Sequence, residues 1–169
     1  MVVSDSSTLI LLAKSNMLDP SLAYFGGITI PGAVEREVVG AGLKHGFDDA
    51  LLVRERINQG KIRVVAGPPK IAATLQREYG LHAGEAGALA LYLRLKADLL
   101  GVDDGKAVKV CRILQVRFFT ALSLAIHLAQ ERIIPKMEAL ACAEALGNHG
   151  RYTKEELELA FDEIGGVTN

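Results

Sequence analysis

The stretch "VVSDSSTLILLAK", residues 2–14, starts with two valines and turns polar at Asp5. Paired β-branched residues favour a buried strand, and the apolar residues in the second half of the stretch recur at helical spacing. We expect the strand to end at Asp5 and a helix to follow, capped by Ser6 or Ser7. A carboxylate is therefore expected where a buried strand gives way to a helix.

The same change from strand to helix recurs along the chain. The predicted strands are 1–5, 27–31, 61–67, 98–104 and 116–121. After the first helix, further helices are predicted at 32–39, 48–59, 83–97, 105–115, 122–132, 135–147 and 153–164. Alternating strands and helices predict a three-layer α/β/α sandwich with a central parallel sheet, closed by C-terminal helices.

Length and composition favour one domain spanning residues 1–169, with 135–169 as a C-terminal helical extension. Half of the residues are hydrophobic and the net charge is −1, so the overall charge does not itself attract nucleic acid or membranes. No apolar run reaches the length of a spanning helix, and Asp5 interrupts any signal-peptide pattern. Because Cys111 and Cys142 suit neither a disulfide framework nor a zinc site, we expect a cytoplasmic protein.

The helical tail carries apolar residues at helical spacing, and this pattern has two interpretations. The tail can pack against the core of its own chain. Alternatively, Leu157, Phe161 and Ile164 can line a groove for a second copy or another protein.

Four acidic positions are candidates for a functional site: Asp5, Glu37, Glu85 and the pair Asp103/Asp104. Each has an ordinary explanation, such as a helix cap, a solvated helix face, a charge at a helix N-terminus or a turn. Taken together they predict a cation site, because carboxylates at the ends of apolar strands are costly to bury without a partner. Oxygen ligands without His or Cys favour Mg²⁺ or Mn²⁺.

Two other acidic-strand folds fail on the sequence. A haloacid-dehalogenase-like phosphatase needs a second aspartate two residues after the first, where this chain has Ser7. A phospho-receiver domain needs an acceptor aspartate about two strands after its acidic pair, yet none lies between Asp104 and Asp162. The metal-site interpretation therefore remains, and Lys106, Lys109 and Arg112 on the following helix are candidate phosphate contacts.

In their order and spacing, several short motifs resemble the PIN-domain superfamily, in particular a PIN-like subfamily related to VapC-type toxins. They are "VVSDSSTLILLAK", "ITIPGAVEREVV", "HAGEAGALALYL", "ADLLGVDDGKAVKVCRILQV" and "GRYTKEELELAFDEIG". The resemblance runs through nearly the whole chain. It implies a metal-dependent ribonuclease acting on single-stranded RNA, the toxin of a toxin–antitoxin pair, with Mg²⁺ or Mn²⁺ as cofactor. It also implies a cognate antitoxin and a homodimer as partners.

The resemblance assigns roles residue by residue. Asp5, Glu85 and Asp103 or Asp104 would hold the metal, and Glu37 would bind metal or orient a water. The implied catalytic set is Asp5, Glu37, Glu85, Asp103 and Asp104, and the substrate-binding candidates are Ser7, Lys106, Lys109 and Thr120.

One position departs from the subfamily pattern. Where that subfamily has a Thr-Gly-like turn, this chain has Thr120 followed by Ala121. A second hypothesis therefore stands beside the nuclease: a catalytically weak PIN-like module that binds an antitoxin, itself or nucleic acid.

Overall fold

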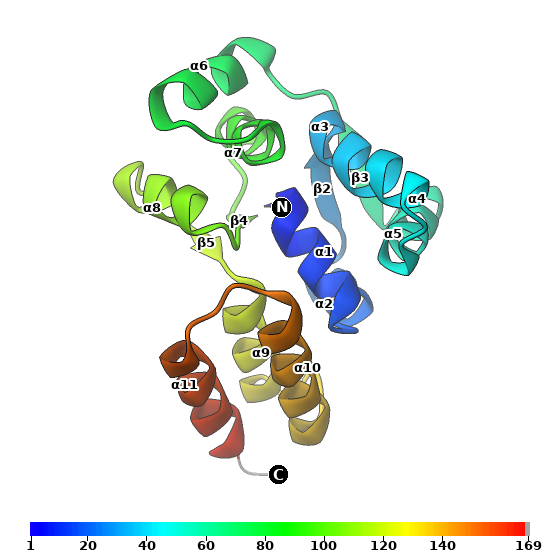
Figure 1. The fold of residues 1–169 in the computed structure, drawn as a ribbon, viewed down its shortest axis with the longest axis vertical. Helices are drawn as coiled ribbons and strands as arrows, with labels where there is room; N and C mark the ends of the chain where they lie inside the picture. Colours follow the sequence, from blue (N-terminus) through cyan, green and yellow to red (C-terminus); the bar gives the residue numbers. More distant parts are fainter. Residues whose placement is uncertain (168–169) are drawn as a thin grey trace.

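A computed structural model describes residues 1–167 and has a five-stranded sheet at its centre (Figure 1). All neighbouring strands pair in parallel, in the order β3-β2-β1-β4-β5. The strands are β1 (Val2–Ser4), β2 (Ile28–Pro31), β3 (Ile62–Val65), β4 (Leu99–Gly101) and β5 (Phe118–Phe119). The predicted α/β/α sandwich with a parallel sheet is confirmed.

The helices that precede residue 80 are α1 (Ser6–Lys14), α2 (Leu18–Phe25), α3 (Gly32–Glu35), α4 (Gly42–Lys44), α5 (Asp48–Asn58) and α6 (Pro69–Tyr79). Those that follow are α7 (Ala83–Leu95), α8 (Gly105–Ile113), α9 (Ala121–Gln130), α10 (Lys136–His149) and α11 (Lys154–Gly165). The last two residues of the predicted 135–169 extension lie outside the described residues.

The strand order reverses between β1 and β4. From β1 the chain moves outward through β2 to β3, and it then returns to the other side of β1 for β4 and β5. In open parallel sheets a crevice forms outside the carboxyl ends of the two strands at such a point. The residues that follow Ser4 and Gly101, which pair in register, therefore meet at this crevice.

Adjacent residues of a strand face opposite sides of the sheet, which divides the core in two. Val2 packs with α1, α2 and α9, whereas Val3 packs with α7 and α8. Helix α7 contacts β1, β2 and β4, so it covers the middle of its face. The sheet is buried on both faces, as expected for parallel strands linked by helices.

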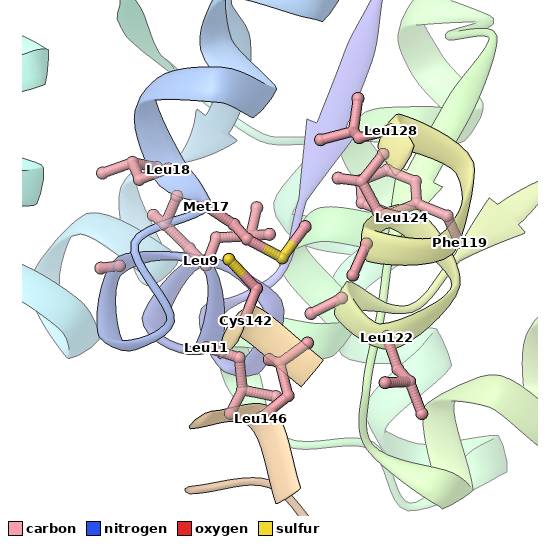
Figure 2. Close-up of a cluster of buried hydrophobic side chains, with 14 of the residues drawn as sticks. Leu9, Leu11, Met17, Leu18, Phe119, Leu122, Leu124, Leu128, Cys142 and Leu146 are labelled. Atoms are coloured by element: carbon pink, nitrogen blue, oxygen red, sulfur yellow. The ribbon is translucent and has the colours of Figure 1, made fainter. Parts of the chain in front are cut away.

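The C-terminal helices pack against the chain's own core. Figure 2 shows Cys142 of α10 beside Leu9 and Met17 and Leu146 of α10 beside Leu11, with Leu128 of α9 on the other side of the cluster. Each large side chain fully buried in this way contributes about 1.5–3 kcal/mol.

Helix α11 closes the same end of the molecule (Figure 1). Ile164 is fully buried in the core and Leu157 is partly buried against it, whereas Phe161 remains exposed. Gly147 of α10 lets Leu157 approach closely, because a Cβ atom there would lie 3.1 Å from a Leu157 methyl group. The predicted cap Thr153 is confirmed, since its hydroxyl accepts a hydrogen bond from the Glu156 amide.

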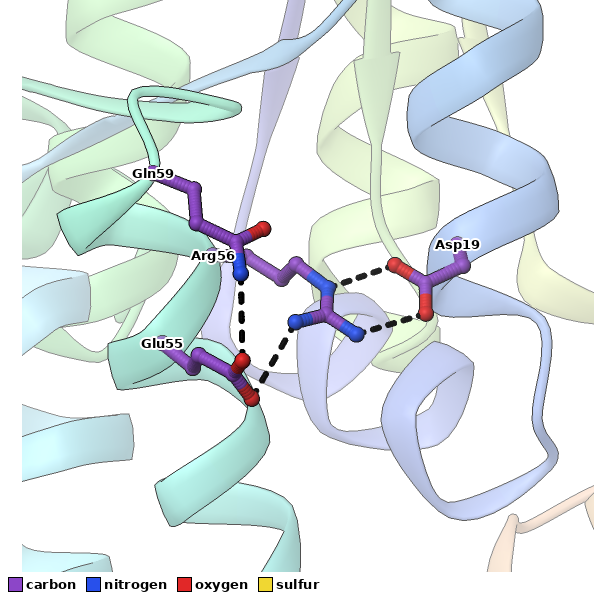
Figure 3. Close-up of polar contacts among 4 residues, drawn as sticks. All are labelled: Asp19, Glu55, Arg56 and Gln59. Carbon is purple, nitrogen blue, oxygen red and sulfur yellow. Dashed lines mark hydrogen bonds and ion pairs between the residues drawn. The ribbon is translucent and has the colours of Figure 1, made fainter.

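Helices α2 and α6 occupy segments for which the sequence patterns gave no expectation. Both end at a glycine in the left-handed conformation, Gly26 and Gly80, which is a common way for a helix to stop. Helix α2 is tied to α5 by a bidentate pair in which Arg56 Nε and Nη2 donate to the Asp19 oxygens at 2.6 and 2.8 Å (Figure 3). This pair lowers the pKa of Asp19.

The segment 32–39, predicted as one helix, is instead interrupted. After α3, residues Arg36–Ala41 form a π-helical segment, η1, before α4 begins. Single-turn π segments are rare and frequently occur at functional sites. Glu37, one of the predicted catalytic residues, lies in this segment.

Within residues 1–167, every helix is too short or too polar to cross a lipid bilayer.

Candidate metal and phosphate site

Asp5 leaves the end of β1 and caps helix α1. Its Oδ1 accepts a hydrogen bond from the Thr8 amide at 2.8 Å, and its own amide donates to the Gly101 carbonyl of β4 at 3.0 Å. The expectation that Ser6 or Ser7 caps this helix is therefore wrong. The carboxylate takes that role because it is the residue that precedes the first helical turn.

The two serines bind carboxylates instead of backbone. Ser7 Oγ lies 3.0 and 2.9 Å from the two Asp5 oxygens, and Ser6 Oγ donates to Glu37 Oε2 at 2.6 Å. Consecutive hydroxyls at the start of one helix therefore serve two different acidic residues.

The two aspartates after β4 have different surroundings. Asp104 caps α8, because its Oδ1 accepts hydrogen bonds from the Lys106 and Ala107 amides at 2.8 and 3.2 Å. Asp103 instead accepts from the Ala121 amide at 3.1 and 3.0 Å and from the Tyr152 hydroxyl.

Asp5 is fully buried at the crevice, and the half-buried Asp103 is close enough for its charge to act on Asp5. Burial, with the neighbouring Asp103 charge as a smaller cause, raises the pKa of Asp5 to about 7. Desolvation likewise raises the pKa of Asp103. The buried Thr8 hydroxyl lies beside both carboxylates and lowers their pKa values, which partly offsets desolvation. Two desolvated carboxylates and a buried hydroxyl thus lie close together.

These donors fit a hard divalent cation. Mg²⁺ is commonly held by one or two carboxylates while it keeps several waters, and Asp5 and Asp103 supply two carboxylates, one buried and one half-buried at the cavity. Within residues 1–167, no group of three or more His, Cys, Asp or Glu side chains is close enough to form a complete protein cage. Two carboxylates would leave most coordination positions of a cation to water.

A cavity of about 530 Å³ opens beside this pair. Its acidic lining residues include Asp103, Asp104 and Glu85, and its hydroxyls include Ser7 and Thr120. Asp5 is fully buried and is not part of the lining. Since the Ser7 hydroxyl bonds Asp5 and also lines the cavity, it lies at the boundary between that carboxylate and solvent.

Glu85 belongs to the first turn of α7, as expected. Its Oε2 accepts a hydrogen bond from the His82 amide at 2.9 Å, so it also stabilises the start of the helix. The predicted residues Asp103, Asp104, Glu85, Ser7 and Thr120 are brought to one cavity by β4, α7, α1 and the start of α9.

Four basic residues line the same cavity, and two of them come from a segment that the sequence marked only as a turn. Arg112 on α8 was a candidate phosphate contact, whereas His149 and Arg151, between α10 and α11, were not. Tyr152 from this turn reaches Asp103. The capping box at Thr153 predicted the turn from the sequence. No sequence signal predicts that this turn lies next to Asp103, which is 49 residues before Tyr152.

Glu37 lies in a neighbouring hollow, away from the Asp103 cavity. This hollow is also lined by Arg36 and His82, and His82 is shared by both spaces. Gly84 allows α7 to approach this point, because a Cβ atom there would lie 2.5 Å from both Glu37 Oε2 and Ser6 Oγ.

Lys106 and Lys109 do not line the cavity, although both are on α8. Lys106 Nζ donates to the Gly80 carbonyl at 3.1 Å, and Lys109 is exposed. Ala121 stands where the subfamily has glycine, and this difference does not affect the hydrogen bond to Asp103, because the backbone amide of residue 121 donates it. As the first residue of α9, Ala121 has an ordinary helical conformation that requires no glycine.

Residues 1–161 match the sequence profile of the PIN domain. No curated protein matches this sequence.

Proposed function

The chain belongs to the PIN-domain superfamily, whose fold is of the nuclease type, and we propose that it hydrolyses single-stranded RNA in a reaction dependent on Mg²⁺ or Mn²⁺. The observation that carries the proposal is the pair of buried Asp5 and half-buried Asp103 beside an open cavity with arginines on its wall. Acidic residues alone would repel a phosphate backbone, so the pairing of buried carboxylates with nearby guanidinium groups favours a phosphodiester substrate.

Asp5 and Asp103 would hold the cation, with Glu85 at the cavity wall. A divalent cation bound there supplies an activated water and stabilises the charge that develops on the phosphate. The Ser7 and Tyr152 hydroxyls bind the same two carboxylates, so they would compete with the cation for Asp5 and Asp103.

Glu85 has a carboxylate oxygen that is free to act as a proton acceptor at the cavity. One of its oxygens, Oε2, accepts a hydrogen bond from the His82 amide, and no hydrogen bond or ion pair within residues 1–167 engages Oε1. That oxygen can accept a proton from a bound water. Glu37, in the neighbouring hollow with its carboxylate held by Ser6, would orient water or substrate from that side.

Cleavage of a mixed panel of single-stranded RNAs tests this proposal. Wild type, Asp5→Asn and Asp162→Asn would be prepared identically and assayed with Mn²⁺ or Mg²⁺. Asp162 is exposed on α11, so its variant has the same charge change away from the site. We expect cleavage by wild type and Asp162→Asn and none by Asp5→Asn. Equal cleavage by all three would contradict the proposal.

The biological setting follows from the same resemblance and is also a proposal. A toxin of this kind would act in the cytoplasm as a homodimer, restrained by a cognate antitoxin. Two features support this setting: Cys111 and Cys142 are buried free thiols, and Met137, Leu159 and Phe161 on α10 and α11 are exposed apolar side chains. Mass measurement of the purified chain at several concentrations would test the dimer.

A second candidate function is a binding module with weak or no catalysis. One observation favours it: Ser7 and Tyr152 already bind the two carboxylates that would hold the metal. Added Mn²⁺ tests whether the metal site works, which the nuclease requires, although it does not by itself demonstrate catalysis. A ligand that binds only the folded state raises its stability, by about 2.7 kcal/mol at a hundred times its Kd. A nuclease site predicts a saturable increase in the Tm of wild type that Asp5→Asn lacks, and a pure binding module predicts none.

A further inference from the structure

We propose that the single-stranded substrate spans both hollows, held by Arg112 and Arg151 on one side of the carboxylate pair and by Arg36 on the other, with His82 between them. This inference rests on the proposed function and adds the path of the strand. It also gives a role to Arg36 and Arg151, which the acidic motifs leave unexplained.

The first argument is where the arginines originate. Arg112 comes from the end of α8 and Arg151 from the turn between α10 and α11, yet both line the cavity that contains Asp103. Arg36 begins the π-helical segment and lines the hollow that contains Glu37. Three elements far apart in the sequence thus bring a guanidinium group to the two adjoining spaces.

The second argument is that these groups lack protein partners. Across residues 1–167, no hydrogen bond or ion pair engages the side chain of Arg36, Arg112 or Arg151. By contrast, Arg56 is bound to Asp19 and Glu55. Glu156, a further acidic residue at the cavity, accepts from the Thr153 amide. The cavity arginines therefore remain available, and a guanidinium group binds phosphate in a bidentate manner.

The third argument is that the two spaces adjoin each other at His82. His82 lines both the cavity of about 530 Å³ and the hollow of about 450 Å³. A single nucleotide would occupy one of them, whereas a strand has phosphates on both sides of the bond to be cleaved. Cations on both sides of the carboxylate pair match a continuous strand. Phe118 is half-buried at the cavity wall and offers a ring on which a base can stack.

Salt dependence of RNA binding tests the proposal without any cleavage. Binding of a fluorescently labelled single-stranded RNA would be followed by anisotropy in EDTA over a range of salt concentrations. For single strands, the logarithm of the binding constant falls with the logarithm of salt by about 0.7 per phosphate contact. Arg36→Gln, Arg112→Gln and Arg151→Gln should each reduce this slope by about 0.7.

Two further variants serve as controls. Arg94→Gln removes one charge near the other end of α7, about 14 Å along the helix from Glu85, and should leave the slope unchanged. Arg151→Lys keeps the charge and should retain the slope. Exposed substitutions of this kind change stability by less than about 0.5 kcal/mol, so folding does not confuse the result.

Each outcome bears on the inference. Unchanged slopes in Arg112→Gln and Arg151→Gln would overturn it, as would the absence of RNA binding at low salt. A change in those two variants without one in Arg36→Gln would overturn the path through the second hollow.

Cleavage with Mn²⁺, measured separately, keeps the two proposals apart. If wild type cleaves RNA and the arginine variants have the same salt slope as wild type, the proposed path is refuted and the proposed nuclease activity is supported. The expected slopes without cleavage support the path and refute the nuclease.

Discussion

The chain continues from a strand into a helix after both β1 and β4, but the aspartates at these two points have different contacts. After β1, a single aspartate, Asp5, both caps the next helix and faces the crevice. After β4 these tasks are divided, because Asp104 caps α8 while Asp103 turns to Asp5, Ala121 and Tyr152. The strand-to-helix geometry is common to both, and each helix receives its carboxylate cap.

The comparison shows that position at a strand end does not identify a functional aspartate. Asp5 and Asp103 are desolvated and their pKa values are raised, whereas the Asp104 carboxylate binds two backbone amides at a helix N-terminus. Burying a carboxylate without a positive partner costs free energy, and a helix cap does not require that burial, as Asp104 shows. The Asp5–Asp103 pair is therefore the better candidate for a metal site.

The largest expected effect contrasts the two neighbours after β4. Asp103→Asn should lower metal-dependent RNA cleavage on the order of 1,000-fold, since a metal ligand contributes several kcal/mol to transition-state stabilisation. Asp104→Asn should lower it less than about tenfold, because asparagine also caps helices. Single-turnover cleavage rates with Mn²⁺ measure both. Equal losses would show that the two aspartates share the metal.

A second prediction concerns how the protein's stability depends on pH through the ionisation of Asp5. The pKa of Asp5 rises from 3.8 to about 7 on folding, so between these values the folded state holds more protons than the unfolded state. Stability then falls as pH rises through this window. Asp5→Asn has no carboxylate to ionise at this position. Its free energy of unfolding, relative to that of wild type, should therefore increase by on the order of 3 kcal/mol between pH 5 and pH 8.

Urea unfolding in EDTA at both pH values measures this difference. Asparagine keeps the cap on α1, so the variant is expected to fold. A constant difference between the two proteins at pH 5 and pH 8 would mean that Asp5 is not desolvated as described.

The third prediction concerns the side chains that cover the pair. Tyr152→Phe removes the hydroxyl that donates to Asp103, and it should lower the Mn²⁺ concentration at half-saturation about tenfold, because hydrogen bonds to charged groups are worth about 1.5–3 kcal/mol. Thermal shift against Mn²⁺ measures the change, with Tyr79→Phe on α6 as the matched control. Weaker Mn²⁺ binding by Tyr152→Phe would instead make the tyrosine part of the metal site.

The smallest expected effect tests Asp104 as a cap. Asp104→Ala should lower the free energy of unfolding by about 0.5–2 kcal/mol, whereas Asp104→Asn should change it little. Denaturant unfolding at neutral pH measures both variants. If the asparagine variant lost as much stability as the alanine variant, the charge of Asp104 would matter beyond capping.

Much of the fold was predictable from local patterns. Alternating strands and helices gave the parallel sheet, and the capping box at Thr153 gave the start of the last helix. Helix α2 was missed although the glycine at its end is a stop signal, since its eight residues are too few to show a clear period. The π segment at Glu37 was also missed, because hydrogen bonds of that kind leave no pattern in a short stretch.

By itself, the sequence determined the fold class, the family and a set of acidic residues at strand and helix ends, because strand and helix periods and caps are local properties. The tertiary structure alone decided which of those residues meet. It separated Asp103 from Asp104, moved Glu37 into a neighbouring hollow, and brought Arg151 and Tyr152 to the carboxylates from the far end of the chain. Desolvation and proximity depend on how distant segments pack, and no local pattern encodes them.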